Sequence, residues 1–169
     1  MRKWSLLALF LGTLAGAACA GAPPPPKTEG DAKPDAPAAP QSPAEKCLAI
    51  AGGQRARQPN EPERVGVRHV LVKFKGAKNA AETITRTREE ACLRAAEARD
   101  KLVAGADFDA IVAEYSDEPG AKERRGLVGV VTRSEVAAPF ADAAFELSVQ
   151  QMSDVVETDR GFHLILRTE

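Results

Sequence analysis

The two histidines of this chain are the residues whose type and position most clearly suggest chemistry. His69 lies in VRHVLVKF and His163 lies in GFHLILRTE, and both runs read as short strands. An imidazole can donate a hydrogen bond through one ring nitrogen and accept one through the other. If the two strands are neighbours, the rings can face one another and form a paired-histidine site. A purely structural polar network is the alternative interpretation of the same pair.

The run around His69 has the pattern of a central strand. Residues 67, 69 and 71 share one face and residues 68, 70 and 72 share the other, because successive side chains of a strand point to opposite faces. Both faces are largely apolar, which favours burial on both sides of a sheet. The strand that carries His69 is therefore expected in the interior of the sheet.

The remaining elements follow from caps, breakers and periodicity. Thr87 begins a helix with Glu90 as the partner of a capping box, and the helical run ends at Gly105. Asp107 caps a shorter second helix, and Pro139 opens a third, where a missing N–H costs little. Strands are predicted at 127–132, 154–158 and 161–168, the last two forming a hairpin. This order predicts an α+β domain with helices packed on a mainly antiparallel sheet.

Several blocks between Val67 and Glu169 resemble the parvulin family of peptidyl-prolyl isomerases. They are, in order, VRHVLVK, ITRTREEA, YSDEPGAK, RGLVG, PFADAAFEL and ETDRGFHLILRTE. Two of them, ITRTREEA and FHLILRTE, are most similar to the phospho-directed branch. The resemblance implies an FKBP-like fold of four strands and about three helices, with the first and last strands adjacent. It also implies catalysis of rotation about X–Pro bonds, which needs no cofactor.

The resemblance assigns catalytic roles by position. The candidates are His69, Ser116, Glu118, Thr158 and His163. The histidines match the pair beneath the family's active site, and Thr158 matches the hydroxyl bonded to that pair. Glu118 stands where the family carries Cys or Asp facing the substrate amide, and the serine matches a position that orients the loop. Asp117 is the alternative carboxylate, and a solvated loop acid is the other interpretation of Glu118.

The same resemblance predicts how the substrate is held. Val128, Val136 and Phe140 match the apolar slot for the proline ring, although spacing alone would make Phe140 a core residue. A further set, Lys73, Lys75 and Lys78, follows the first strand, where the phospho-directed branch receives a phosphate beside the proline. A solvated basic loop is the alternative interpretation of these lysines. An acidic residue before proline is a second candidate ligand for them.

Residues 1–20 have the pattern of a targeting segment. Arg2 and Lys3 precede an apolar run at 6–14 that is too short to span a bilayer comfortably. Small residues then lead to Cys19, a pattern similar to a bacterial lipoprotein signal in which this cysteine is lipidated. An ordinary secretory signal cleaved near Ala18 or Ala20, and an uncleaved anchor, are the alternatives. All three place the domain outside the cytoplasm, and lipidation would anchor it to a membrane on the periplasmic side of the cell envelope.

A linker and a short extension are expected between this segment and the domain. Residues 21–45 are rich in Pro and Ala and have no large apolar residue, so they predict a disordered linker. Residues 46–64 form a short N-terminal extension that can begin with one or two helical turns, and the domain itself spans 65–169. An oxidising compartment favours a bridge between Cys47 and Cys92, which would attach the extension to the first helix of the domain.

Composition excludes several other functions. The net charge of −1 gives no reason to expect nucleic-acid binding. The chain has no CxxC, no Gly-rich phosphate loop and no metal-binding motif. We therefore expect a monomeric, exported peptidyl-prolyl isomerase that acts on proline-containing segments of unfolded or exported proteins as a folding helper. The alternatives are a non-catalytic peptide-binding chaperone module of the cell envelope and a tethered structural component.

Overall fold

The computed structural model describes residues 42–169. The predicted targeting segment, the lipidation site at Cys19 and almost all of the predicted linker lie outside the described residues. Within the part of the chain that is described, no helix is long and apolar enough to cross a membrane.

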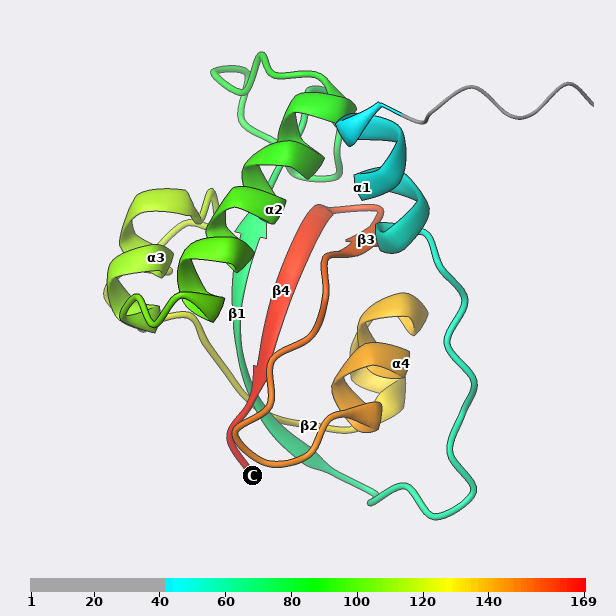
Figure 1. Cartoon of the computed structure of the whole chain (residues 1–169). Helices are drawn as coiled ribbons and strands as arrows, with labels where there is room; N and C mark the ends of the chain where they lie inside the picture. The colour runs from blue at the N-terminus through cyan, green and yellow to red at the C-terminus, as the bar shows by residue number, and fades with distance from the viewer. Residues whose placement is uncertain (1–41) are drawn as a thin grey trace, which may run out of the picture. The chain divides into compact units, whose positions relative to one another are not determined.

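Four antiparallel strands form one sheet in the order β2–β1–β4–β3 (Figure 1). The central strands are β1 (Val65–Val72) and β4 (Gly161–Arg167), and the edges are β2 (Leu127–Val131) and β3 (Val156–Thr158). The pairing of β1 with β4 places Leu71 opposite His163 and His69 opposite Ile165. The first and last strands are thus neighbours, as the family resemblance implied, and β1 is an interior strand, as its two apolar faces predicted.

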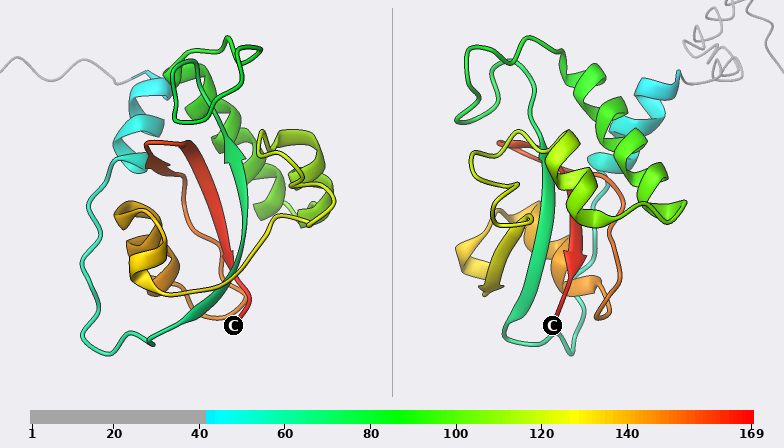
Figure 2. Two further views of the ribbon diagram at one scale, coloured as in Figure 1. Left: turned by 180° about the vertical axis from the view of Figure 1, so that it is seen from behind. Right: turned by 90° about the vertical axis from the view of Figure 1, so that its left-hand side faces the viewer.

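Helices cover both faces of the sheet (Figure 2). Three of them, α1 (Pro43–Ala51), α2 (Arg88–Val103) and α3 (Phe108–Tyr115), pack on one face, and α4 (Ala138–Glu146) packs on the other after the 3-10 turn η1 (Arg133–Glu135). Val70 and Val72 of β1 join the core beneath α1–α3, whereas Val65 and Val67 join the core beneath α4. The alternation along β1 therefore separates two apolar cores, and His69 lies on the face of the sheet that α4 covers.

The boundary predicted between the linker and the extension, after residue 45, falls inside a helix. α1 begins at Pro43, inside the segment expected to be linker, because Ser42 and Glu45 form a capping box and Pro43 occupies the first turn. Its buried Cys47 forms a disulfide with Cys92 of α2, the pairing that was expected, with 6.0 Å between the Cα atoms. The extension predicted at 46–64 therefore begins with a helix that is part of the domain's core.

Candidate active site

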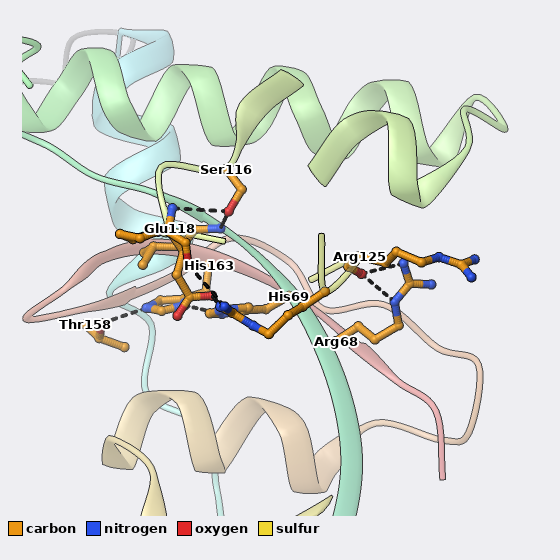
Figure 3. Close-up of polar contacts among 10 residues, drawn as sticks. Arg68, His69, Ser116, Glu118, Arg125, Thr158 and His163 are labelled. Atoms are coloured by element: carbon orange, nitrogen blue, oxygen red, sulfur yellow. Dashed lines mark hydrogen bonds and ion pairs between the residues drawn. The ribbon is translucent and has the colours of Figure 1, made fainter. Parts of the chain in front are cut away.

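The two histidines lie side by side on adjacent strands (Figure 3). His69 projects from β1 and His163 from β4, and both side chains are buried. Their rings are stacked, with 5.3 Å between centroids and 21° between planes. The two Nδ1 atoms are 3.1 Å apart, so one of them carries a proton and the other accepts it. The face-to-face pair expected from the sequence is present.

Each histidine has a second polar partner, and the partners fix the direction of the hydrogen bonds. His69 Nε2 lies 2.8 Å from Glu118 Oε2, and an ionised carboxylate can only accept, so His69 Nε2 donates. In a neutral His69, Nδ1 then accepts from Nδ1–H of His163, whose Nε2 accepts from the Thr158 hydroxyl at 2.8 Å. The backbone N–H of Arg160 donates to the same hydroxyl oxygen at 3.1 Å. Thr158, His163, His69 and Glu118 thus form one chain of hydrogen bonds that all point toward the carboxylate.

The electrostatics of the site agree with this assignment. Complete burial holds the pKa of His163 well below its ordinary value, and the neighbouring His69, Arg160 and Lys73 act in the same direction. His163 is therefore neutral near pH 7. The hydrogen bond from His69 lowers the pKa of Glu118, with Arg124 adding to the effect and burial opposing it. Glu118 is therefore ionised and remains an acceptor.

Glu118 is positioned by a loop that takes the place of a strand. β2 pairs with β1 only as far as Arg68, and residues 116–126 run along the rest of β1. The N–H of Leu71 donates to Ser116 Oγ at 3.3 Å, and the N–H of Asp117 donates to the Leu71 carbonyl at 2.7 Å. At the other end, the N–H of His69 donates to the Gly126 carbonyl at 2.8 Å. Ser116 thus lies where it can orient the loop, as the resemblance implied.

Asp117, the alternative carboxylate, has a different position. Its Oδ2 accepts from the backbone N–H of Lys73 at 2.8 Å and pairs with Arg86. It does not line the pocket described below. The hypothesis that Asp117 replaces Glu118 at the site is therefore wrong, because the side chain fastens the loop to β1.

The opposite face of β1 holds the same loop through residues that the sequence analysis missed. Arg68 donates to the Arg125 carbonyl (Figure 3). It also pairs with Asp109 of α3, which in turn pairs with Arg125. The Arg68 guanidinium also lies 4.6 Å from the ring centroid of Phe108. Neighbouring residues of β1 thus fix the loop from one face and bind Glu118 from the other. A charged residue in an otherwise apolar strand was the one signal that could have identified this role for Arg68.

A pocket of about 320 Å³ opens above the histidine pair. The Phe140 ring is nearly perpendicular to both imidazoles, at centroid distances of 5.8 Å from His69 and 5.3 Å from His163. The structure brings together the three predicted slot residues here. The pocket is lined by His69, Leu71, Glu118, Arg124, Leu127, Val128, Glu135, Val136, Ala137, Phe140, Thr158, Arg160 and His163. One side of the pocket is therefore apolar, and the other is formed by Glu118 at the end of the hydrogen-bond chain.

The predicted lysine patch is not part of this pocket. Lys73 is buried, and its Nζ donates to the Asn79 carbonyl at 2.6 Å. Lys78 pairs with Asp159 at 3.1 Å, and Lys75 is exposed away from the lining. The structure therefore places the three predicted lysines outside the pocket lining, and the Lys73 side chain is held by the backbone carbonyl of Asn79.

The cations that do line the pocket are arginines that the sequence analysis missed. Arg124 comes from the loop that carries Glu118, and Arg160 comes from the turn between β3 and β4. The position of Arg160, two residues after Thr158, was the signal that could have identified it. Across residues 42–169, no group of three or more His, Cys, Asp or Glu side chains is arranged to hold a metal ion.

Comparison with known proteins gives a consistent result. The family described as rotamase, PPIC-type PPIASE domain, matches residues 69–169. Peptidyl-prolyl cis-trans isomerase Pin1 from Malus domestica is 39% identical over 114 residues, which cover 62% of this chain and 93% of that protein. Foldase protein PrsA 4 from Bacillus cereus is 37% identical over 75 residues, 44% of this chain and 27% of that protein. The solved structure of peptidyl-prolyl isomerase ESS1 from Candida albicans matches with a TM-score of 0.60 and 28% identity over 65% of each chain.

Proposed function

The chain belongs to the rotamase family of PPIC-type peptidyl-prolyl cis-trans isomerases, and on this premise we propose that the pocket above His69 and His163 is its active site. The observation that carries the proposal is the unbroken hydrogen-bond chain from Thr158 to Glu118 beneath a pocket with Phe140 as one wall. A peptide-binding module would need the apolar wall alone. The ordered polar floor favours catalysis.

The reaction requires only that the pocket bind the twisted amide more tightly than the planar one. Rotation about a peptide bond meets a barrier of about 18–20 kcal/mol, and no bond is made or broken. In this proposal Phe140, Val128 and Val136 hold the proline ring, and the apolar wall keeps water from the amide. The polar groups at the Glu118 end are already fixed by hydrogen bonds, so they stabilise the twisted amide without rearranging during the reaction.

The length of Glu118 suits this role. The family resemblance places Cys or Asp at this position, and a glutamate is one methylene longer than Asp. Here the longer side chain lets Oε2 reach His69 Nε2 at 2.8 Å while the residue still lines the pocket. We propose that Glu118 fixes the tautomer of His69 and gives the pocket its polar edge.

We further propose that the enzyme is exported and assists the folding of exported proteins. The support is the targeting pattern at residues 1–20 with Cys19 at its end, and the Cys47–Cys92 disulfide, which suits an oxidising compartment. The similarity to a foldase from Bacillus cereus is consistent with this role. Mass spectrometry of the protein from the membrane fraction tests it: a lipid-modified N-terminal Cys19 is expected, and an unprocessed Met1 in the soluble fraction would contradict export.

The substrate preference proposed here follows from the cations in the pocket. Because Arg160 lines the pocket and the lysines do not, we expect acidic residues before proline to be favoured through this arginine. Exchange NMR on peptides with Ala, Glu, Leu, Lys or phospho-Ser before proline measures both activity and preference. Acceleration with all five, strongest for the acidic ones and weakened by Arg160→Ala, is the expected result. Binding without acceleration of any peptide would instead support the chaperone module.

A further inference from the structure

Two polar contacts hold the Arg124 side chain beside Glu118. Its Nη2 is 3.2 Å from Glu118 Oε2, the same oxygen that accepts from His69. Its Nη1 donates to the carbonyl oxygen of Pro119 at 3.2 Å. The guanidinium therefore binds both the side chain of Glu118 and the backbone that follows it. About half of the Arg124 side chain remains exposed, and the residue lines the pocket.

Gly120 allows this close approach. The residue has φ of 72°, a region that favours glycine, and a Cβ atom built on it would lie 2.7 Å from Arg124 Nη1. Any larger residue would push the guanidinium away from the loop. Residues 118–120 thus form the binding site of the Arg124 guanidinium. They contribute the Glu118 carboxylate, the Pro119 carbonyl and, at Gly120, the space left by the missing side chain.

The charges around Glu118 leave Arg124 as its one permanent cationic partner among the described residues. His69 from β1 donates to the carboxylate through Nε2, but an imidazole, unlike a guanidinium, carries no permanent charge. Glu135 of η1 lines the same pocket, but its carboxylate accepts from Thr132. Arg160, from the turn between β3 and β4, lines the pocket without an ion pair to Glu118. A guanidinium stays charged at every pH that proteins tolerate.

We infer that Arg124 is a positioning residue for isomerisation, which holds the Glu118 carboxylate directed at His69 Nε2. The inference rests on the proposed role of Glu118. A half-exposed ion pair adds little to folding stability. The effect of Arg124 is therefore expected in catalysis rather than in the stability of the fold.

The primary test compares Arg124→Ala with Lys122→Ala, which removes an exposed positive charge from the same loop. The substrate is an uncharged Ala–Pro peptide, so that no direct pairing with the peptide contributes. We expect Arg124→Ala to lower kcat/KM about fivefold. The acid limb of the pH profile of kcat/KM should move to higher pH in this variant, because Glu118 gains a proton more readily without the guanidinium. Arg124→Lys should restore part of the kcat/KM and part of the pH profile, and Lys122→Ala should match the wild type in both.

A double-mutant cycle with Glu118→Gln shows whether Arg124 acts through Glu118. The inference predicts that Arg124→Ala has no further effect on kcat/KM once Glu118 is replaced. Equal losses in both backgrounds, or a pH profile of Arg124→Ala that matches Lys122→Ala, would overturn it. If Glu118→Gln alone leaves the rate and pH profile unchanged, the proposed role of Glu118 fails and the inference fails with it. A loss for Glu118→Gln with none for Arg124→Ala would remove only the inference.

Discussion

The tautomers of His69 and His163 are set by the groups at the two ends of their hydrogen-bond chain. Glu118 accepts at one end, and the Thr158 hydroxyl, whose oxygen accepts from the Arg160 backbone N–H, donates at the other. If His69 gained a proton, its Nδ1 would become a donor and the direction of the chain between the rings and Thr158 would reverse. The site is thus ordered by donors and acceptors that complement one another, not by the histidines alone.

Replacing Thr158 is the cleanest test of this hydrogen-bond chain. Thr158→Val keeps the shape but removes the hydroxyl, which leaves the buried His163 Nε2 and the Arg160 N–H without their partner. We expect the free energy of unfolding to fall by about 1–3 kcal/mol, and kcat/KM to fall with it. Urea unfolding and exchange NMR measure the two effects. Thr158→Ser, which retains the hydroxyl, should stay close to the wild type in both, and equal losses in the two variants would contradict the assignment.

The loop at 116–126 is the element that places Glu118, and its return to β2 depends on Gly126. This glycine has φ of 72°, and a Cβ there would clash with the backbone carbonyl of His69. At the same point, the carbonyl oxygen of Gly126 accepts a hydrogen bond from the His69 N–H. The close contact between loop and strand is what keeps Glu118 within reach of His69.

A pair of glycine substitutions separates this contact from ordinary backbone strain. Gly126→Ala and Gly105→Ala both place a side chain at positive φ, which costs about 1–2 kcal/mol, but Gly105 has open space around it. We expect Gly105→Ala to lose stability only, and Gly126→Ala to lose more stability and most of its activity. Faster hydrogen exchange of the His69 amide in Gly126→Ala would report the displaced strand. Equal stability and activity in the two variants would show that the contact is unimportant.

The disulfide between Cys47 and Cys92 links α1 to α2 on the face away from the pocket. Its two cysteines are 45 residues apart, for which the chain-entropy model gives about 4 kcal/mol of stabilisation. We expect reduction, or Cys47→Ala with Cys92→Ala, to lower the free energy of unfolding by up to this amount. The kcat/KM of the folded protein should not change. A loss of activity without loss of the fold would indicate that the two faces of the sheet are coupled.

Elements were more predictable from the sequence than the contacts between them. Capping residues and periodicity located the helices after Thr87 and Asp107, because these signals are local. The adjacency of β1 and β4 came from the family resemblance, since strand pairing over such a separation leaves no local signal. The start of α1 was missed because the capping box at Ser42 lies in a proline-rich stretch. Lys73 was misplaced because the path of a loop decides where its side chains point.

The stability of the whole molecule should depend on pH through His163. Burial lowers the pKa of this histidine in the folded protein, whereas in the unfolded chain it is about 6.5. The unfolded state therefore binds a proton first, and stability is lost as pH falls below about 6.5. The depressed pKa of Glu118 adds a further loss at more acidic pH, as its carboxylate gains a proton. Urea midpoints measured between neutral and acidic pH should show the first loss in the wild type and not in His163→Gln.

The measurement that tests the central claim most directly is exchange NMR of an Ala–Pro peptide with Phe140→Leu and Phe145→Leu. Both phenylalanines are buried on α4, but only Phe140 lines the pocket and contacts both imidazoles. The wild type should accelerate cis–trans exchange. Phe145→Leu should retain that exchange rate although its free energy of unfolding falls. Phe140→Leu should lose most of the acceleration, with a free energy of unfolding similar to that of Phe145→Leu. Equal activity in the two variants would place the active site elsewhere.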